Sequence, residues 1–556
     1  MRARNFFACA PLNKMNANVQ LGTETVEGII SQGVLEPPSR MDSAKTAHLL
    51  RTIGFNTFCQ VGAQLAPAAA AIFSIPALLR HLGPEAYGIV TLFSTVLIYF
   101  AMLDLGLGRA TTRFIAQSLE AGNRDEVGRY FWSSLLLLTG AGLIVSVCFL
   151  FAAPVLVMRY LKISPAYSHD TIRAFYLICA TIPLVTLMAG LRGFLEAAGR
   201  FPFLSAVTAC AGACMYAVPV LVVIEGGGLV AIAATYVAIR IAMAIAFAIG
   251  CMGAKLRPPL RPTLDRQALK QMASFGGWLS LSNVIGTAMV YGDRFLLGSF
   301  AGMAAVASYS MPLDVIGRMQ ILITSFCAVL FPLLSRLDGS GSAHFQRVYR
   351  GALAIVLSSI TPLTVTVILL SPFLMRLWLR EHNTSEAVFA AQVFLAGSIV
   401  QAMASISFTA LHARGRSDLA AWAHTAEFPV YCIAFFWAAT RFGVRGAALV
   451  WFGRVITDFA CMVVLLRVEE RNRGFLLTPQ LAAILASILV LLTSIFQPAH
   501  ALVLEITICL LTWLWTWRVL LDLDMRRLLV YSISSSIKGL SRTVGDAECT
   551  RNSRLL

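Results

Sequence analysis

The chain has 556 residues, of which 58% are hydrophobic and 13% are charged. This excludes a water-soluble globular protein of ordinary composition, in which about 25% of the residues are charged. The mean hydropathy of +0.75 also excludes fibrous folds and disorder of the whole chain. The formal net charge of +16 is spread among short loops, which argues against a nucleic-acid partner, since that would need basic residues on one soluble face. The composition therefore predicts an all-α integral membrane protein.

The N-terminal segment 1–53 precedes the first long apolar run. Its apolar patch, Phe6 to Leu12, is too short for the core of a signal peptide. We therefore expect a disordered cytoplasmic extension, with the first membrane span serving as the insertion signal.

The apolar runs that follow are long enough to cross about 30 Å of hydrocarbon, and they predict about 14 transmembrane helices. The loops after the even-numbered spans, together with both ends of the chain, hold most of the Lys and Arg residues. This distribution places both termini in the cytoplasm. The predicted spans lie at about 54–79, 88–108, 130–157, 173–195, 203–224, 229–252, 273–298, 304–333, 351–375, 387–411, 419–440, 444–466, 480–497 and 500–521.

Landmarks in the sequence recur at a lag of about 215 to 220 residues, as expected for the internal repeats that are frequent in transporters. Gly199–Arg200 after the fourth span, for example, falls on Gly415–Arg416 after the tenth. Each repeat holds six spans, which predicts two six-helix lobes and a central cavity. The predicted organisation is an N-lobe (54–252), a basic cytoplasmic linker (253–272), a C-lobe (273–466), an extra helix pair (480–521) and a basic cytoplasmic tail (522–556).

A pattern of helix ends carries a family resemblance. The stretch from Ile75 to Gly88, IPALLRHLGPEAYG, is followed by LDLGL at 103–107 and RFIA at 113–116. This resembles the opening of bacterial polysaccharide export proteins, the lipid-linked oligosaccharide flippases of the multidrug/oligosaccharidyl-lipid/polysaccharide exporter superfamily. The long N-terminal extension departs from the usual pattern.

The resemblance implies a non-enzymatic transporter of the bacterial inner membrane that works by alternating access of two lobes. The implied substrate is a lipid-linked oligosaccharide on undecaprenyl pyrophosphate, for exopolysaccharide or O-antigen synthesis. The phospholipid bilayer, a polysaccharide polymerase and a chain-length regulator are further partners to consider.

Polar residues inside the spans are candidates for the substrate site, because such groups are costly in hydrocarbon and face the bundle interior or water. Spacings of three and four place them on single helix faces. Amides and hydroxyls could replace the hydration of sugars, and a guanidinium suits a pyrophosphate. The predicted substrate-binding residues are Arg294, Arg318, Asn283, Thr287, Tyr291, Asn56, Gln60, Gln64 and Gln401.

Two of these arginines have a second interpretation. Arg318 lies one turn after Asp314, whose carboxylate would neutralise it. Arg294 lies near a helix end and could extend to the membrane interface instead.

Other charges inside the spans are candidates for gating or coupling. Arg240 and Arg454 occupy equivalent places in the repeats. Two roles are open for them: an ion pair between Arg454 and Asp458 that holds helices in register, or direct contact with the substrate. Glu427 is a candidate coupling carboxylate. Asp104, at the predicted cytoplasmic end of the second span, is a candidate for a gate or for an ion pair at the helix end. The complete gating or coupling set is Asp104, Asp293, Asp314, Arg240, Arg454, Asp458 and Glu427.

Several signatures of other functions are missing from the sequence. It has no Walker A loop and no H-E-x-x-H motif, and most of its 12 Cys lie in apolar runs, so neither a metal site nor a cofactor is predicted. A drug/cation antiporter of the same superfamily remains an alternative, and it would need a cavity dominated by carboxylates and aromatic rings. A membrane-bound polysaccharide polymerase or acyltransferase is a second alternative, which the lack of a large periplasmic loop disfavours.

Overall fold

The computed structural model describes residues 43–102, 107–253, 265–337, 342–379 and 384–469, together with scattered positions between 487 and 518. Contacts divide the chain into Met1–Phe55 and Asn56–Leu556, and the description below concerns the second unit. Every secondary-structure element in the described ranges is helical, as predicted. The first group comprises α2 (Ser43–Met102), α3 (Leu107–Glu120), α4 (Arg124–Val155), the π-helical turn η1 (Leu156–Tyr160), α5 (Pro165–Ala180), α6 (Ile182–Ala197), α7 (Phe201–Ile224) and α8 (Leu229–Met252).

A second group of helices follows the segment 254–264. It comprises α9 (Arg266–Phe300), α10 (Met303–Ile316), the 3₁₀ turn η2 (Gly317–Met319), α11 (Gln320–Arg336), α12 (Ser342–Leu379), α13 (Thr384–Ala413) and α14 (Ser417–Glu469). We call α2 to α8 the N-terminal helices and α9 to α14 the C-terminal helices.

Within the described ranges, nine helical segments are long and apolar enough to cross a membrane. These segments and α9 overlap the first twelve predicted spans, because α2 and α14 each overlap two of them. The number of fourteen stays a prediction, since most of the predicted pair 480–521 and all of the tail lie outside the described residues. The N-terminal extension before Ser43 lies outside them as well.

Glycines with positive φ mark the bends between spans. Gly83 (φ 79°) interrupts α2, and Gly443 (φ 57°) interrupts α14, in a left-handed region that residues with a Cβ rarely adopt. Three pairs of such glycines recur at the predicted lag of about 215 to 220 residues. The pairs are Gly83 with Gly302, Gly199 with Gly415, and Gly226 with Gly443. Matching bends at these places are what a repeat of six spans would give.

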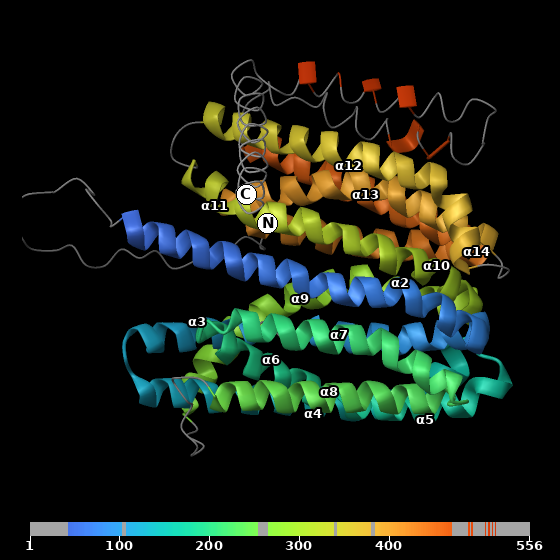
Figure 1. Cartoon of the computed structure of the whole chain (residues 1–556), viewed down its shortest axis with the longest axis horizontal. Helices are drawn as coiled ribbons and strands as arrows, with labels where there is room; N and C mark the ends of the chain where they lie inside the picture. The colour runs from blue at the N-terminus through green and yellow to red at the C-terminus, as the bar shows by residue number, and fades with distance from the viewer. Residues whose placement is uncertain are drawn as a thin grey trace, which may run out of the picture. The chain divides into compact units, whose positions relative to one another are not determined.

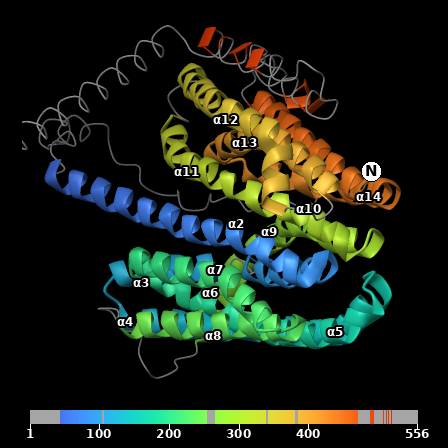
Figure 2. The same ribbon diagram turned by 45° about the vertical axis from the view of Figure 1, so that its right-hand side comes forward.

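The helices α3 to α8 pack mainly among themselves, and so do α10 to α14 (Figure 1). In the first group α6 packs on α3, α4 and α8. In the second, α13 is surrounded by α10, α11, α12 and α14, and it is the most buried of the candidate spans. The helix α9 also packs against α3 and α4, so it joins the two groups. Figure 2 shows α3 and α5 at opposite ends of the N-terminal helices, as does Figure 1.

Candidate functional site

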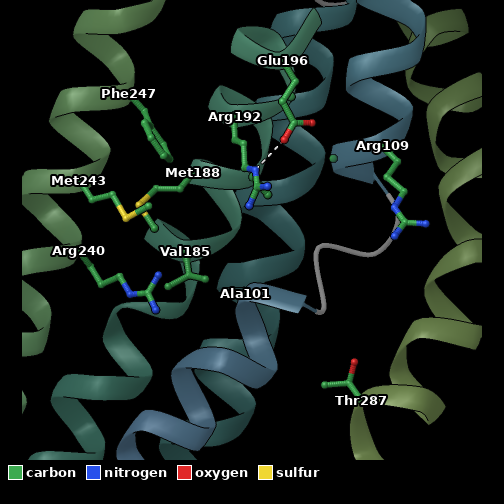
Figure 3. A pocket seen from close by; sticks show the side chains of 13 residues that line it. Ala101, Arg109, Val185, Met188, Arg192, Glu196, Arg240, Met243, Phe247 and Thr287 are labelled. Carbon is green, nitrogen blue, oxygen red and sulfur yellow. Dashed lines mark hydrogen bonds and ion pairs between the residues drawn. The ribbon is translucent and has the colours of Figure 1, made fainter. Parts of the chain in front are cut away.

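A cavity of about 420 Å³ opens among α3, α6, α8 and α9 (Figure 3). Its size falls within the usual range of small-ligand sites, about 300–1,000 Å³. The residues that line it are Ala101, Gly108, Arg109, Val185, Met188, Ala189, Arg192, Gly193, Glu196, Arg240, Met243, Phe247 and Thr287.

Three arginines and one glutamate give the cavity its charge. Glu196 accepts a hydrogen bond of 2.7 Å from Arg192 Nε and one of 3.3 Å from the Thr112 hydroxyl. Arg109 is exposed at the start of α3. The described part of the lining is therefore cationic, and the carboxylate in it is already engaged.

Arg240 differs from the other two arginines because it lies half-buried in the middle of α8. Its Nε is buried and has no hydrogen-bond partner, and no ion pair to its guanidinium is found in the described part of the chain. An intramembrane cation without a counter-charge is costly, and such residues mark substrate pathways. Arg240, which was predicted to act in gating or coupling, thus lies in the wall of a cavity.

An apolar wall lies beside these cations. It consists of Val185 and Met188 from α6 and of Met243 and Phe247 from α8. Val185, Met188 and Phe247 are buried, and Met243 is half-buried. The cavity thus combines cationic groups with a surface that lacks polar atoms.

A separate buried cluster surrounds Arg294 in α9. Its guanidinium donates to Asp314 Oδ1 at 2.5 Å and to Thr95 Oγ1 of α2 at 2.9 Å, and it lies over the ring of Tyr291. The neighbouring Asp293 is buried and accepts a hydrogen bond of 2.7 Å from the Tyr309 hydroxyl. Only 3% of the Arg294 side chain is exposed, so it does not extend to an interface.

Arg318 also joins the two groups of helices. It donates a hydrogen bond of 2.9 Å to the Tyr216 hydroxyl of α7 and lies over that ring. The ion pair of Asp314 is formed with Arg294, and in the described part of the chain none joins Asp314 to Arg318. The i,i+4 spacing alone therefore misidentifies the partner of Asp314. Near Arg318, Gln320 donates to Gln401 at 3.2 Å.

The two halves of α14 form a third polar cluster. His424 and Asp458 are 3.1 Å apart between Nε2 and Oδ1, whereas no Arg454–Asp458 ion pair is found in the described part of the chain. Arg454 lies over the ring of Tyr431. The Oε1 atom of Glu427 is buried without a hydrogen-bond partner. The predicted coupling residues of this half therefore lie on one kinked helix.

The remaining predicted residues are dispersed. Thr287 lines the cavity, and Gln64 is exposed on α2. The side chains of Asn56, Gln60 and Asn283 and the whole of Asp104 lie outside the described residues. Conversely, Arg109 and Arg192 line the cavity although their positions near span ends suggested only a role in topology.

At the end of the helices near α5, the two groups make direct contact. The backbone N–H of Lys162 donates to the Gly298 carbonyl at 3.2 Å, and its Nζ donates to the Phe300 carbonyl at 2.7 Å. A Cβ on Gly88 would collide with the Met303 carbonyl oxygen. The cavity lies toward the other end, where α3 begins and α6 ends.

Long apolar helices in two packed groups, with a cationic cavity among α3, α6, α8 and α9, are the features of a multi-span membrane transporter. Residues 53–338 match the model of the polysaccharide biosynthesis protein family. The chain belongs to this family, and the predicted family and the predicted location in the bacterial inner membrane are confirmed.

Known proteins agree with this assignment. A Shigella flexneri protein named as a candidate O-antigen transporter is 28% identical over 398 residues, covering 70% of this chain and 92% of that protein. The lipid II flippase MurJ in an inward closed conformation superposes with a TM-score of 0.62 at 13% identity, over 82% of this chain and 96% of MurJ. An inward-facing multidrug resistance transporter of the MATE family gives 0.61 at 16% identity, over 79% of this chain and all of that one. The two structures show that the fold is shared.

Proposed function

We propose that the protein translocates undecaprenyl-pyrophosphate-linked oligosaccharides from the cytoplasmic to the periplasmic leaflet of the inner membrane, for O-antigen or exopolysaccharide synthesis. The observation that supports this most directly is the guanidinium of Arg240 in the cavity wall, which has no ion-pair partner among the residues that the structure describes. A pyrophosphate supplies the missing negative charge, and a guanidinium can bind it with paired hydrogen bonds. The name of the Shigella flexneri relative supports the same substrate class.

In this proposal Arg109, Arg192 and Arg240 together receive the pyrophosphate. Arg109 and Arg192 lie toward the end predicted to be cytoplasmic and attract the anion first, since exposed charges steer an approaching ligand. Arg240 lies deeper, so the anion meets it after leaving bulk water.

The asymmetry of the contacts between the two groups of helices supports alternating access as part of this proposal. The contacts of Lys162 and Gly88 close the end predicted to be periplasmic, while the cavity lies toward the other end. We infer that this arrangement is the inward-facing state and that outward opening breaks these contacts. Arg294 and Arg318 stay candidates for substrate binding, but each would first have to release its partner in the N-terminal helices.

The drug/cation antiporter is the alternative function, and the fold is compatible with it. The three arginines and the paired glutamate among the described lining residues disfavour an organic cation, because like charges repel. The discriminating experiment offers the purified protein in lipid vesicles either a fluorescent lipid-linked oligosaccharide or a fluorescent organic cation. Movement of the oligosaccharide alone supports the proposal. Movement of the cation alone contradicts it.

A further inference from the structure

The cavity has a cationic part and an apolar wall, and a pyrophosphate would contact only the cationic part. Among the described lining residues, Glu196 supplies the carboxylate and Thr287 the side-chain hydroxyl, and Glu196 is already occupied by Arg192 and Thr112. A sugar needs many hydrogen-bond partners when it leaves water, because unsatisfied polar groups are costly to bury. The described part of the lining therefore suits an anion with an attached hydrocarbon better than it suits a sugar.

The apolar wall continues directly from the cationic positions. On α6, Arg192 follows Met188 by one turn, and on α8, Met243 follows Arg240 by one turn, so each arginine shares a helix face with a methionine. In Figure 3 the side chains of Met188 and Met243 lie close together between α6 and α8, with Arg240 on one side and Arg192 on the other. An anion at either arginine would hold its neighbouring atoms against this wall.

Methionine is well suited to such a contact. Its unbranched, polarizable side chain adapts to flexible apolar ligands. Phe247 adds a buried aromatic surface one turn beyond Met243. The volume of about 420 Å³ lies in the lower part of the small-ligand range, so the cavity accommodates a part of a lipid-linked oligosaccharide and not the whole molecule.

We propose that Val185, Met188, Met243 and Phe247 form a subsite for the first isoprene units of the lipid carrier. The cavity would then recognise the junction between prenyl chain and pyrophosphate, which is independent of the sugar. This inference rests on the proposed function, because it assumes that the pyrophosphate binds at the three arginines.

The test compares two soluble probes, geranyl pyrophosphate and inorganic pyrophosphate, by calorimetry on the full-length protein in detergent. Arg240→Gln in the same detergent gives the baseline for binding to micelles. We expect geranyl pyrophosphate to bind at least about tenfold more tightly than inorganic pyrophosphate, because its isoprene carbons leave water. Equal affinities for the two probes would overturn the prenyl subsite while leaving the anion site intact. Failure of both probes to bind above the baseline would overturn the proposed function as well.

Substitutions in the apolar wall test which residues cause the preference for geranyl pyrophosphate over inorganic pyrophosphate. Met188→Gln or Met243→Gln keeps an unbranched side chain but adds an amide, and we expect each to reduce the preference for the prenyl probe severalfold with inorganic pyrophosphate binding unchanged. Met252→Gln, at an exposed position on the same helix, is the matched control. Retained binding of inorganic pyrophosphate shows that a variant is folded. An unchanged preference in both wall variants would place the prenyl contact elsewhere and contradict the inference.

Discussion

Arg294 of α9 and Thr95 of α2 are joined by a hydrogen bond of 2.9 Å that crosses from the C-terminal to the N-terminal helices. Both side chains are buried. Asp314 binds the same guanidinium, so the donor of the crossing bond is held in a fixed position. The bond therefore helps to hold the two groups of helices in the observed arrangement.

Thr95→Val removes this crossing bond with little change of shape. We expect a loss of about 1.5–3 kcal/mol from the observed state, the range for hydrogen bonds to charged groups. Thermal unfolding of the detergent-solubilised protein measures this loss of stability. Thr235→Val is the control, because Thr235 donates only to a carbonyl of its own helix. Equal stability of the two variants would show that the bond between Arg294 and Thr95 contributes nothing.

Asp314→Asn should be more damaging than Thr95→Val. It leaves the buried charge of Arg294 without its carboxylate, and breaking a buried ion pair from one side costs about 3–5 kcal/mol. The yield of folded protein after extraction reports this cost. Arg294→Gln in the same chain should restore part of the yield, because it removes the unpaired charge. No recovery in the double variant would argue against this explanation.

Gly88→Leu should prevent closure at the end near α5. A side chain at this position meets the Met303 carbonyl, so the contact can form only if the helices move apart. In a chain without its native cysteines, cysteines in place of Lys162 and Phe300 should crosslink readily, and Gly88→Leu should reduce the yield severalfold. Gly140→Leu, where a Cβ meets nothing within 4 Å, should leave it unchanged. The same crosslinking yield in the double-cysteine parent and in its Gly88→Leu and Gly140→Leu variants would exclude a steric role for Gly88.

Glu427→Gln tests the predicted coupling role of this carboxylate. The Oε1 atom of Glu427 is buried without a partner, close in sequence to the pair of His424 and Asp458. We expect the variant to transport substrate at a rate that no longer responds to a pH gradient, because the amide cannot exchange a proton. The exposed Glu225→Gln should behave like the wild type. A gradient response that persists in Glu427→Gln would remove this residue from coupling.

The helices and the family were predictable from sequence because both depend on local patterns. Apolar runs define spans, and the stretch from Ile75 to Gly88 carries the resemblance. Partners across helices were not predictable in this way. The spacing of Asp314 and Arg318 favoured a local pair, whereas the fold brings Arg294 to Asp314 and Tyr216 to Arg318.

The cavity was missed for a related reason. Arg109 and Arg192 lie near span ends, where basic residues are expected on topological grounds alone. Only the packing of α3, α6 and α8 shows that they share a cavity with Arg240. Sequence periodicity assigns a face to each helix, but it does not say which faces meet.

The most direct test of the pyrophosphate site is the initial rate at which Arg240→Ala moves a lipid-linked oligosaccharide across the membrane of reconstituted vesicles. If Arg240 binds the pyrophosphate, the rate at limiting substrate should fall at least about tenfold, Arg240→Lys should keep part of it, and Arg173→Ala, at an exposed arginine, should keep all of it. A wild-type rate in Arg240→Ala would show that this cavity does not receive the anionic head of the substrate.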